Sequence, residues 1–150
     1  MSIMVDKKDE TILNELKKNA RKSTKAIANS CKLPRVTVHD RIQKMIRKGV
    51  IQSFTAIPNY EQLGLPSKVF ILVSFLPNPN VSQRELAKRI AKLPGVYEIH
   101  IISGEYDLLL KVRGKSLEEI GKLVVDKLRQ LNGVGRTVSC ACFETVKEEI

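Results

Sequence analysis

The sequence predicts an α+β protein in which three N-terminal helices precede a β-α-β-β-α-β unit. In the first 48 positions, apolar residues recur at the three- and four-residue steps of amphipathic helices. From position 68, runs rich in β-branched residues alternate with two further helical patterns. Between these halves, residues 58–66 (PNYEQLGLP) contain two prolines and a glycine, which indicate a linker. We therefore expect one domain over 1–57 and a second over 67–150.

Charge is distributed unevenly between the two halves. The 150 residues carry a formal net charge of +10; residues 1–60 hold 13 Lys and Arg against 5 Asp and Glu, and the remainder holds 13 against 11. A basic N-terminal part followed by a nearly neutral C-terminal part is typical of a protein that binds a polyanion through one domain. Apolar residues make up 43% of the chain, which is enough for a buried core.

Cysteine and histidine are too sparse to indicate a metal site. Cys31, Cys140 and Cys142 show no C-x-x-C spacing, and the histidines are His39 and His100. Cys140 and Cys142 lie two residues apart on an expected strand, so we expect both to point into the core. Unpaired cysteines, the lack of a signal-peptide pattern and the lack of a long apolar run all favour a cytoplasmic protein without a membrane partner.

The first helix is expected to begin at Asp6. Asp9 follows three residues later, and acidic residues in these places favour a helix N-terminus. The apolar stripe of this helix comprises Ile12, Leu13 and Leu16. Because the pattern stops near 19–21, the helix is short enough to pack behind the pair of helices that follows.

The pattern of residues 23–48 predicts two helices joined by a very short turn at residues 32–33. Ser23 is placed to cap the first, over 24–31, and Pro34 suits the first turn of the second, which Gly49 ends. One stripe of the second helix is apolar and comprises Val38, Ile42, Met45 and Ile46. The opposite face is polar and basic, so the pair is typical of a helix-turn-helix, whose second helix enters the major groove of DNA. The alternative is an ordinary hairpin with a solvated charged face.

The segment that follows the third helix is rich in residues that favour strands. Residues 50–57 (VIQSFTAI) alternate in part between apolar and polar side chains. We expect them to form a wing or a linking strand that leaves the helical domain, which makes this a winged helix-turn-helix.

The second half alternates strand and helix patterns. Strands are expected over 68–75, 96–103, 106–112 and 134–146. Helices are expected over 82–93 and 117–131, capped by Ser82 and Ser116. This order predicts a ferredoxin-like sheet with both helices on one face. The other face also carries apolar residues, among them Phe70 and Leu72, so we expect a second copy of the chain to cover it.

Five stretches, in order and at matching spacing, make the chain similar to the Lrp/AsnC (feast/famine) family of transcriptional regulators. They are 5–21, 33–42, 49–51, the glycine-acid stretch 104–110, and 131–137. The resemblance covers essentially the whole chain. It implies a ferredoxin-like domain of the RAM type, a homodimer or a larger assembly such as an octamer, and allosteric regulation by an amino acid. One departure is Pro34, where the family usually has a capping serine.

The third helix carries most of the residues that are expected to contact double-stranded DNA. Those near its start are Arg35, Val36, Thr37, His39 and Asp40. Arg35 is the candidate for reading guanine, because its fork fits the O6 and N7 acceptors, and Asp40 can accept from a cytosine amino group. Phosphate contacts are expected from Lys22, Lys25, Arg41, Lys44, Arg47 and Lys48. A simply solvated side chain is the alternative for each lysine.

A small effector is expected at the turn around residue 104. The candidate set comprises Ser103, Gly104, Glu105, Tyr106, Asp107, Thr137 and Ser139. Gly104 lets backbone N–H groups approach a carboxylate, and Asp107 can pair with an ammonium group. From the residues alone, the alternative is a plain β-turn in which Asp107 bonds its own backbone. The family resemblance favours binding.

Together with the family resemblance, these patterns predict a sequence-specific transcriptional regulator, without a cofactor or a metal, and the resemblance implies that an amino acid changes its assembly or DNA affinity. The alternative is an architectural protein that wraps DNA without an effector and binds broadly, with a steep salt dependence. An enzyme is not expected, because the sequence shows no nucleophile–base pair, metal cluster or phosphate-binding loop.

Overall fold

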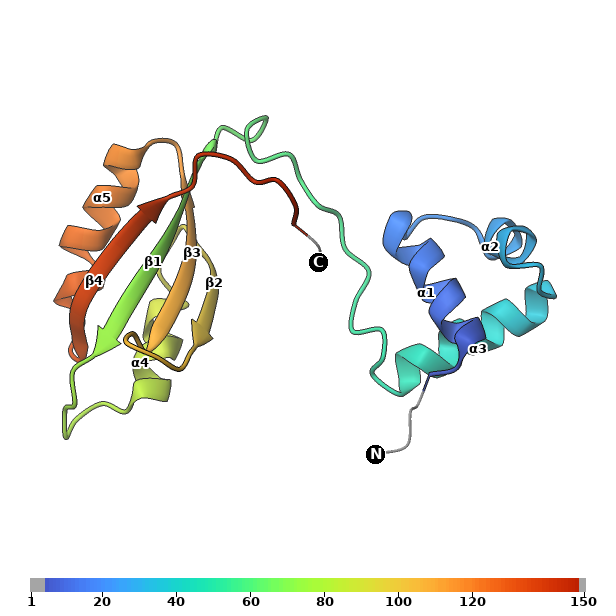
Figure 1. Cartoon of the computed structure of the whole chain (residues 1–150), viewed down its shortest axis with the longest axis horizontal. Coiled ribbons are helices and arrows are strands. Elements are labelled where there is room, and N and C mark those ends of the chain that lie inside the picture. Colours follow the sequence, from blue (N-terminus) through green and yellow to red (C-terminus); the bar gives the residue numbers. More distant parts are fainter. Residues whose placement is uncertain (1–4, 149–150) are drawn as a thin grey trace. The chain divides into compact units, whose positions relative to one another are not determined.

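The computed structural model describes residues 5–148 and divides into two compact units, one up to Ile57 and one from Pro58 onward (Figure 1). No helix in the described part of the chain is long and apolar enough to cross a membrane. The same residues contain no group of three His, Cys, Asp or Glu side chains placed to hold a metal ion. Each unit is described separately below.

The N-terminal unit consists of three helices, α1 (Lys7–Lys18), α2 (Thr24–Cys31) and α3 (Arg35–Arg47). Asp6 starts α1 with a capping box: its carboxylate accepts from the N–H of Lys8 and of Asp9, and the Asp9 carboxylate accepts from the N–H of Asp6. The three helices enclose a small apolar core made of Ile12, Leu16, Ile27, Ala28, Val38, Met45 and Ile51. The expected packing of the first helix behind the other two is confirmed.

The turn between α2 and α3 is as short as the sequence predicts. Ser23 Oγ accepts from the N–H of Ala26, and α2 ends at Lys32 in the left-handed conformation, with φ of 53°. The helix α3 then begins directly after Pro34, and no side chain caps it. Proline therefore sets the backbone angle for the first turn without supplying the capping oxygen of a serine.

The predicted strand over 50–57 was wrong. The N–H groups of Val50 and Ile51 both donate to the carbonyl of Met45, at 2.9 and 3.2 Å, so these two residues close the end of α3 instead. Residues 52–59 follow without regular secondary structure, and Phe54 and Ile57 are 51% and 70% exposed. A strand needs a partner for its ladder, and no segment of the described chain pairs with this stretch.

The C-terminal unit has the predicted β-α-β-β-α-β order. Its elements are β1 (Ser67–Phe75), α4 (Gln83–Ile90), β2 (Val96–Ile101), β3 (Leu108–Gly114), α5 (Leu117–Asp126), a 3-10 turn η1 (Leu128–Gln130) and β4 (Val134–Ala141). The four strands form one antiparallel sheet in the order β2-β3-β1-β4. Ser82 and Ser116 cap α4 and α5 as expected, through the N–H groups of Glu85 and Glu119.

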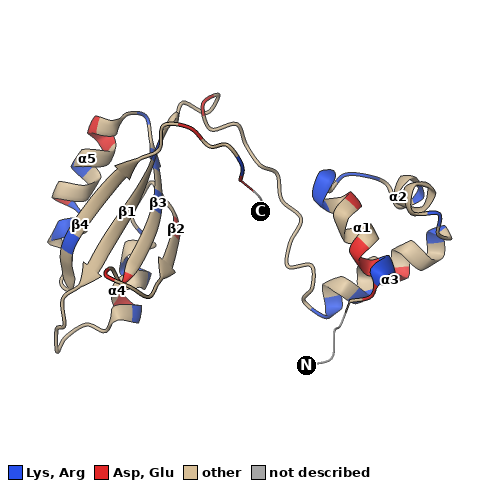
Figure 2. Ribbon diagram, viewed as in Figure 1, with Lys and Arg blue, Asp and Glu red and all other residues tan. Residues whose placement is uncertain are grey.

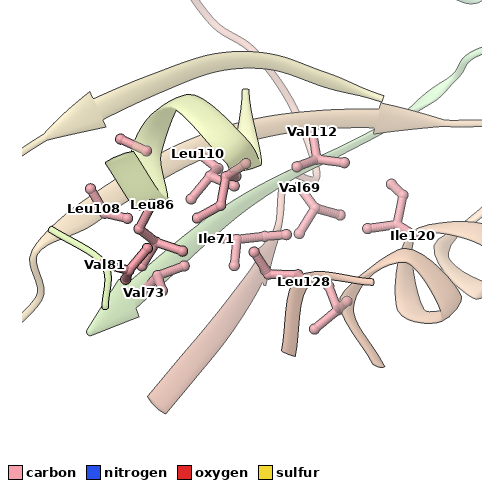
Figure 3. Close-up of a cluster of buried hydrophobic side chains, with 13 residues drawn as sticks. Val69, Ile71, Val73, Val81, Leu86, Leu108, Leu110, Val112, Ile120 and Leu128 are labelled. Carbon is pink, nitrogen blue, oxygen red and sulfur yellow. The ribbon is translucent and has the colours of Figure 1, made fainter. Parts of the chain in front are cut away.

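Both helices pack on one face of this sheet (Figure 3). The buried residues of β1, Val69, Ile71 and Val73, alternate with Phe70 and Leu72, which are half-buried on the other face. From the helices, the buried side chains that meet the sheet are Leu86, Ile90, Ile120 and Val124. The opposite face carries no helix among the described residues, as the sequence predicts.

The position expected for the last two cysteines was wrong. Cys140 pairs with Phe70 across β1 and β4, so its side chain lies on the face without helices and is exposed. Cys142 follows the end of β4 at Ala141, five residues before the expected end of this strand at residue 146, and it is half-buried outside the sheet. Strand alternation therefore directs Cys140 away from the helix-covered core.

Candidate DNA-reading helix and effector turn

The exposed side of α3 forms a polar and basic surface. A shallow groove runs along it and is lined by Thr37, His39, Asp40, Arg41, Gln43, Lys44 and Arg47. A second hollow at the start of the helix is lined by Thr24, Arg35, Val36 and His39. Val36 is 70% exposed although it is apolar, so its methyl groups face solvent at the first turn. Lys and Arg residues occur along α3 and on or beside α1 and α2 (Figure 2).

Two of the predicted phosphate contacts are engaged within the protein. Arg41 Nη1 lies 2.7 Å from Asp6 Oδ2 and 2.8 Å from Asp9 Oδ1, so it joins α3 to the capping box of α1. Lys22 Nζ bonds Glu15 and, at 2.7 Å, Ser30 Oγ, so it joins α1 to α2. The structure thus gives Arg41 and Lys22 a role in holding the helices together, whereas Arg35, Lys44 and Arg47 form no ion pair within the described residues.

These contacts also lower the pKa of two of the acidic partners, Glu15 and Asp6. The Lys22 ammonium group, followed by that of Lys18, lowers the pKa of Glu15 to about 2. The N–H of Asp9 and the Arg41 guanidinium hold the pKa of Asp6 below its ordinary value. Both carboxylates therefore stay ionised at neutral pH, and both keep their cations bound to the helical unit.

We predict that Arg41→Met destabilises the N-terminal unit by about 1–3 kcal/mol, because Asp9, a residue that is 3% exposed, loses the cation of its carboxylate. Thermal unfolding followed by calorimetry measures this change. Lys44→Met is the matched control, since Lys44 is exposed on the same helix. Equal unfolding temperatures in the two variants would show that the Arg41 contacts add nothing to stability.

The predicted effector turn is anchored by its own aspartate. The N–H of Ile102 donates to the Asp107 carbonyl at 2.9 Å, and the N–H of Asp107 donates to the Val73 carbonyl at 3.0 Å. Asp107 Oδ2 accepts from the N–H of Phe75 at 2.6 Å, so the carboxylate ties the turn to the end of β1. Gly104 has φ of +119°, which favours glycine. The structure thus uses the Asp107 carboxylate inside the protein, on the backbone of another strand.

The remaining predicted effector residues divide into two groups. Thr137 and Ser139 lie opposite Val73 and Ile71 on β1, so they share the helix-covered side of the sheet, and Thr137 Oγ1 accepts from Arg129 Nε at 2.9 Å. Glu105 and Tyr106 are instead joined to a residue that the sequence reasoning missed, Arg136. Its guanidinium lies 2.5 Å from Glu105 and 5.1 Å from the centre of the Tyr106 ring.

Each of the two units matches a known protein family. The profile described as the Lrp/AsnC ligand binding domain matches residues 68–150, and the profile for a winged helix-turn-helix DNA-binding domain matches residues 5–52. The chain is 47% identical, over the whole of both chains, to the uncharacterized HTH-type transcriptional regulator PF0250 of Pyrococcus furiosus. It is 36% identical to the HTH-type transcriptional regulator LysM of Saccharolobus solfataricus, over 94% of this chain and 95% of that protein.

Solved structures share the fold at lower identity. The transcriptional regulator NMB0573 of Neisseria meningitidis, in a structure described as an L-Met complex, has a TM-score of 0.91 at 23% identity, covering 97% of this chain and 94% of that one. The AsnC protein of E. coli has a TM-score of 0.87 at 21% identity, covering 98% and 97%. The fold is therefore shared along nearly the full length of the chain.

Proposed function

Since the chain belongs to the Lrp/AsnC family of DNA-binding transcriptional regulators, we propose that it reads specific DNA sequences through α3 and that an amino acid, bound at the turn over 102–107, changes its DNA affinity. The family is one of regulators with a ligand-binding domain and not of enzymes. The observation that carries the first part of the proposal is the exposed, uncapped first turn of α3.

Base contacts are assigned to the first two turns of α3. Arg35 is free of ion pairs within the described residues and carries the fork that guanine O6 and N7 accept. The exposed methyl groups of Val36 suit the methyl group of thymine, and Asp40 suits a cytosine amino group. Thr37 and His39 line the same surface. Phosphate contacts are assigned to Lys25, Lys44 and Arg47, while Lys22 and Arg41 position the helices.

The effector is assigned to the turn because it presents polar groups from a rigid backbone. Ser103, Gly104, Glu105 and Tyr106 lie between Ile102 and Asp107, which one backbone bond joins, and a second backbone bond holds Asp107 to Val73 on β1. The Neisseria relative, whose structure is described as an L-Met complex, supports an amino acid as the class of ligand. Thr137 and Ser139 lie on β4 on the helix-covered side of the sheet, where Thr137 accepts from Arg129.

A second copy of the chain is assigned to the face of the sheet without helices. Phe70 and Leu72 on β1 are half-buried there, and Val138 on β4 is 37% exposed. Covering these side chains stabilises a homodimer, and further contacts between dimers build a larger assembly such as an octamer. A dimer also presents two copies of α3 to DNA half-sites roughly 34 Å apart. The effector then acts through different affinities for two assemblies.

The proposal is tested by selecting DNA sequences that bind the purified protein and then measuring their affinity with each of the twenty amino acids. We expect enrichment of one sequence motif and a change in affinity with one or two amino acids. Binding to the folded state also raises the thermal unfolding midpoint. Enrichment of no motif, with a steep salt dependence and no amino-acid response, would instead support an architectural protein that wraps DNA.

A further inference from the structure

Glu105 and Arg136 form an ion pair beside the effector turn that the fold itself does not require. The pair joins Arg136 Nη2 to Glu105 Oε1 at 2.5 Å, and the side chains are 60% and 72% exposed. Ion pairs this exposed add little to stability, because water solvates the separated charges almost as well. A ligand can therefore separate these two charges at small cost.

The backbone that carries both side chains is held firmly. The N–H of Arg136 donates to Ser74 Oγ at 2.7 Å, and a Cβ on the preceding Gly135 would lie only 2.6 Å from that oxygen. This close approach fixes β4 against β1 where Arg136 begins. On the other side, the bond from the Phe75 N–H to Asp107 fixes the turn that carries Glu105. Two opposite charges thus project from rigid backbone on exposed side chains.

The other charged groups near this turn are engaged elsewhere. The Asp107 carboxylate accepts from the backbone of β1, and Arg129 donates to Thr137 on the helix-covered side of the sheet. Within the described part of the chain, this leaves Glu105 as the exposed anion and Arg136 as the exposed cation at the turn. The Tyr106 ring lies against the Arg136 guanidinium and restricts where it can move.

We propose that this pair recognises the zwitterionic end of the effector, with Arg136 binding the α-carboxylate and Glu105 binding the α-ammonium group. The inference rests on the proposed function and adds the ligand chemistry of the site. The guanidinium fork matches a carboxylate through two parallel hydrogen bonds, and a carboxylate accepts well from an ammonium group. A ligand with both charges replaces each half of the ion pair. A ligand with one charge leaves one of the two side chains unpaired, so the pair selects amino acids over simple acids and amines.

The test follows thermal unfolding and calorimetric binding of the full-length protein with each of the twenty L-amino acids. For the amino acid with the largest shift, its carboxamide and its N-acetyl derivative are measured next, since each lacks one of the two charges. We expect both derivatives, and the variants Arg136→Gln and Glu105→Gln, to lose about tenfold or more in affinity. Arg136→Lys, which keeps the charge but not the fork, is expected to fall between Gln and the native residue.

Lys122→Gln is the matched control, because Lys122 forms an equally simple exposed pair with Glu118 at 2.9 Å on α5. It should bind as the native protein does, and all variants should unfold at the native temperature without ligand. If the native protein responds to an amino acid and Arg136→Gln binds it equally well, the pair has no part in recognition and the proposed function stands. If no amino acid shifts the native protein, this proposal and the effector part of the proposed function are both overturned, whereas DNA reading by α3 is unaffected.

Discussion

Asp107→Ala is expected to abolish the effector response and to destabilise the C-terminal unit by about 1–3 kcal/mol, because the N–H of Phe75 loses its acceptor at the end of β1. The same change releases the turn that carries Glu105, so loss of binding follows from loss of the turn's geometry and needs no contact between Asp107 and the effector. Calorimetric unfolding and amino-acid titration of the same sample measure both effects.

Asp107→Asn separates the structural role from a direct one. The amide oxygen of asparagine can still accept from the Phe75 N–H, but it carries no charge for an ammonium group. We expect Asn to recover most of the stability and most of the amino-acid affinity that Ala loses. An Asn variant with native stability and no amino-acid binding would instead show that Asp107 contacts the ammonium group of the effector directly.

Helix starts and element order were predictable because their causes are local. Asp6, Ser23, Ser82 and Ser116 each cap a helix through a backbone N–H two or three residues away, so the signal lies within one turn of sequence. The alternation along β1 likewise follows from the strand itself, which places every second side chain on the helix-covered face. These elements require no knowledge of distant partners.

Arg41 and Asp107, whose predicted contacts were external, have internal partners that are distant in the sequence. Arg41 meets Asp6 and Asp9, 35 and 32 residues away, and the basic face of a helix gives no sign of which arginine is taken up in this way. Asp107 meets Phe75 at a separation of 32 residues. Such pairs depend on how helices pack and on the register of strands, and the residue pattern within one helix or strand predicts neither.

Arg136 was left out of the predicted effector site because of the face of β4 on which it lies. Strand alternation puts Arg136 and Thr137 on opposite faces of β4. The predicted effector site used the face of Thr137 and Ser139, and it therefore left out Arg136. The opposite charges of Glu105 and Arg136 are the sequence feature that could have indicated a contact between the turn and the helix-free face of β4. The strand predicted over 50–57 failed for the converse reason, since its composition favours a strand but the chain supplies no partner.

Arg35→Ala is expected to remove about 1–3 kcal/mol of discrimination at one base pair of the DNA site while leaving non-specific binding nearly unchanged. Arg35 stands in the first turn of α3, next to Val36, and makes no ion pair within the described residues that would hold it on the protein. Affinities for the selected site and for its variants at each base pair, measured at one salt concentration, give the discrimination directly.

Lys44→Ala provides the contrast on the same helix. Lys44 lines the groove further along α3 and is assigned to a phosphate, so its loss should weaken all sequences alike and reduce the salt slope by about 1. If Arg35→Ala instead weakens every sequence equally and lowers the slope in the same way, Arg35 is a phosphate contact. Base reading would then fall to Val36, Thr37, His39 and Asp40, which occupy the same exposed surface.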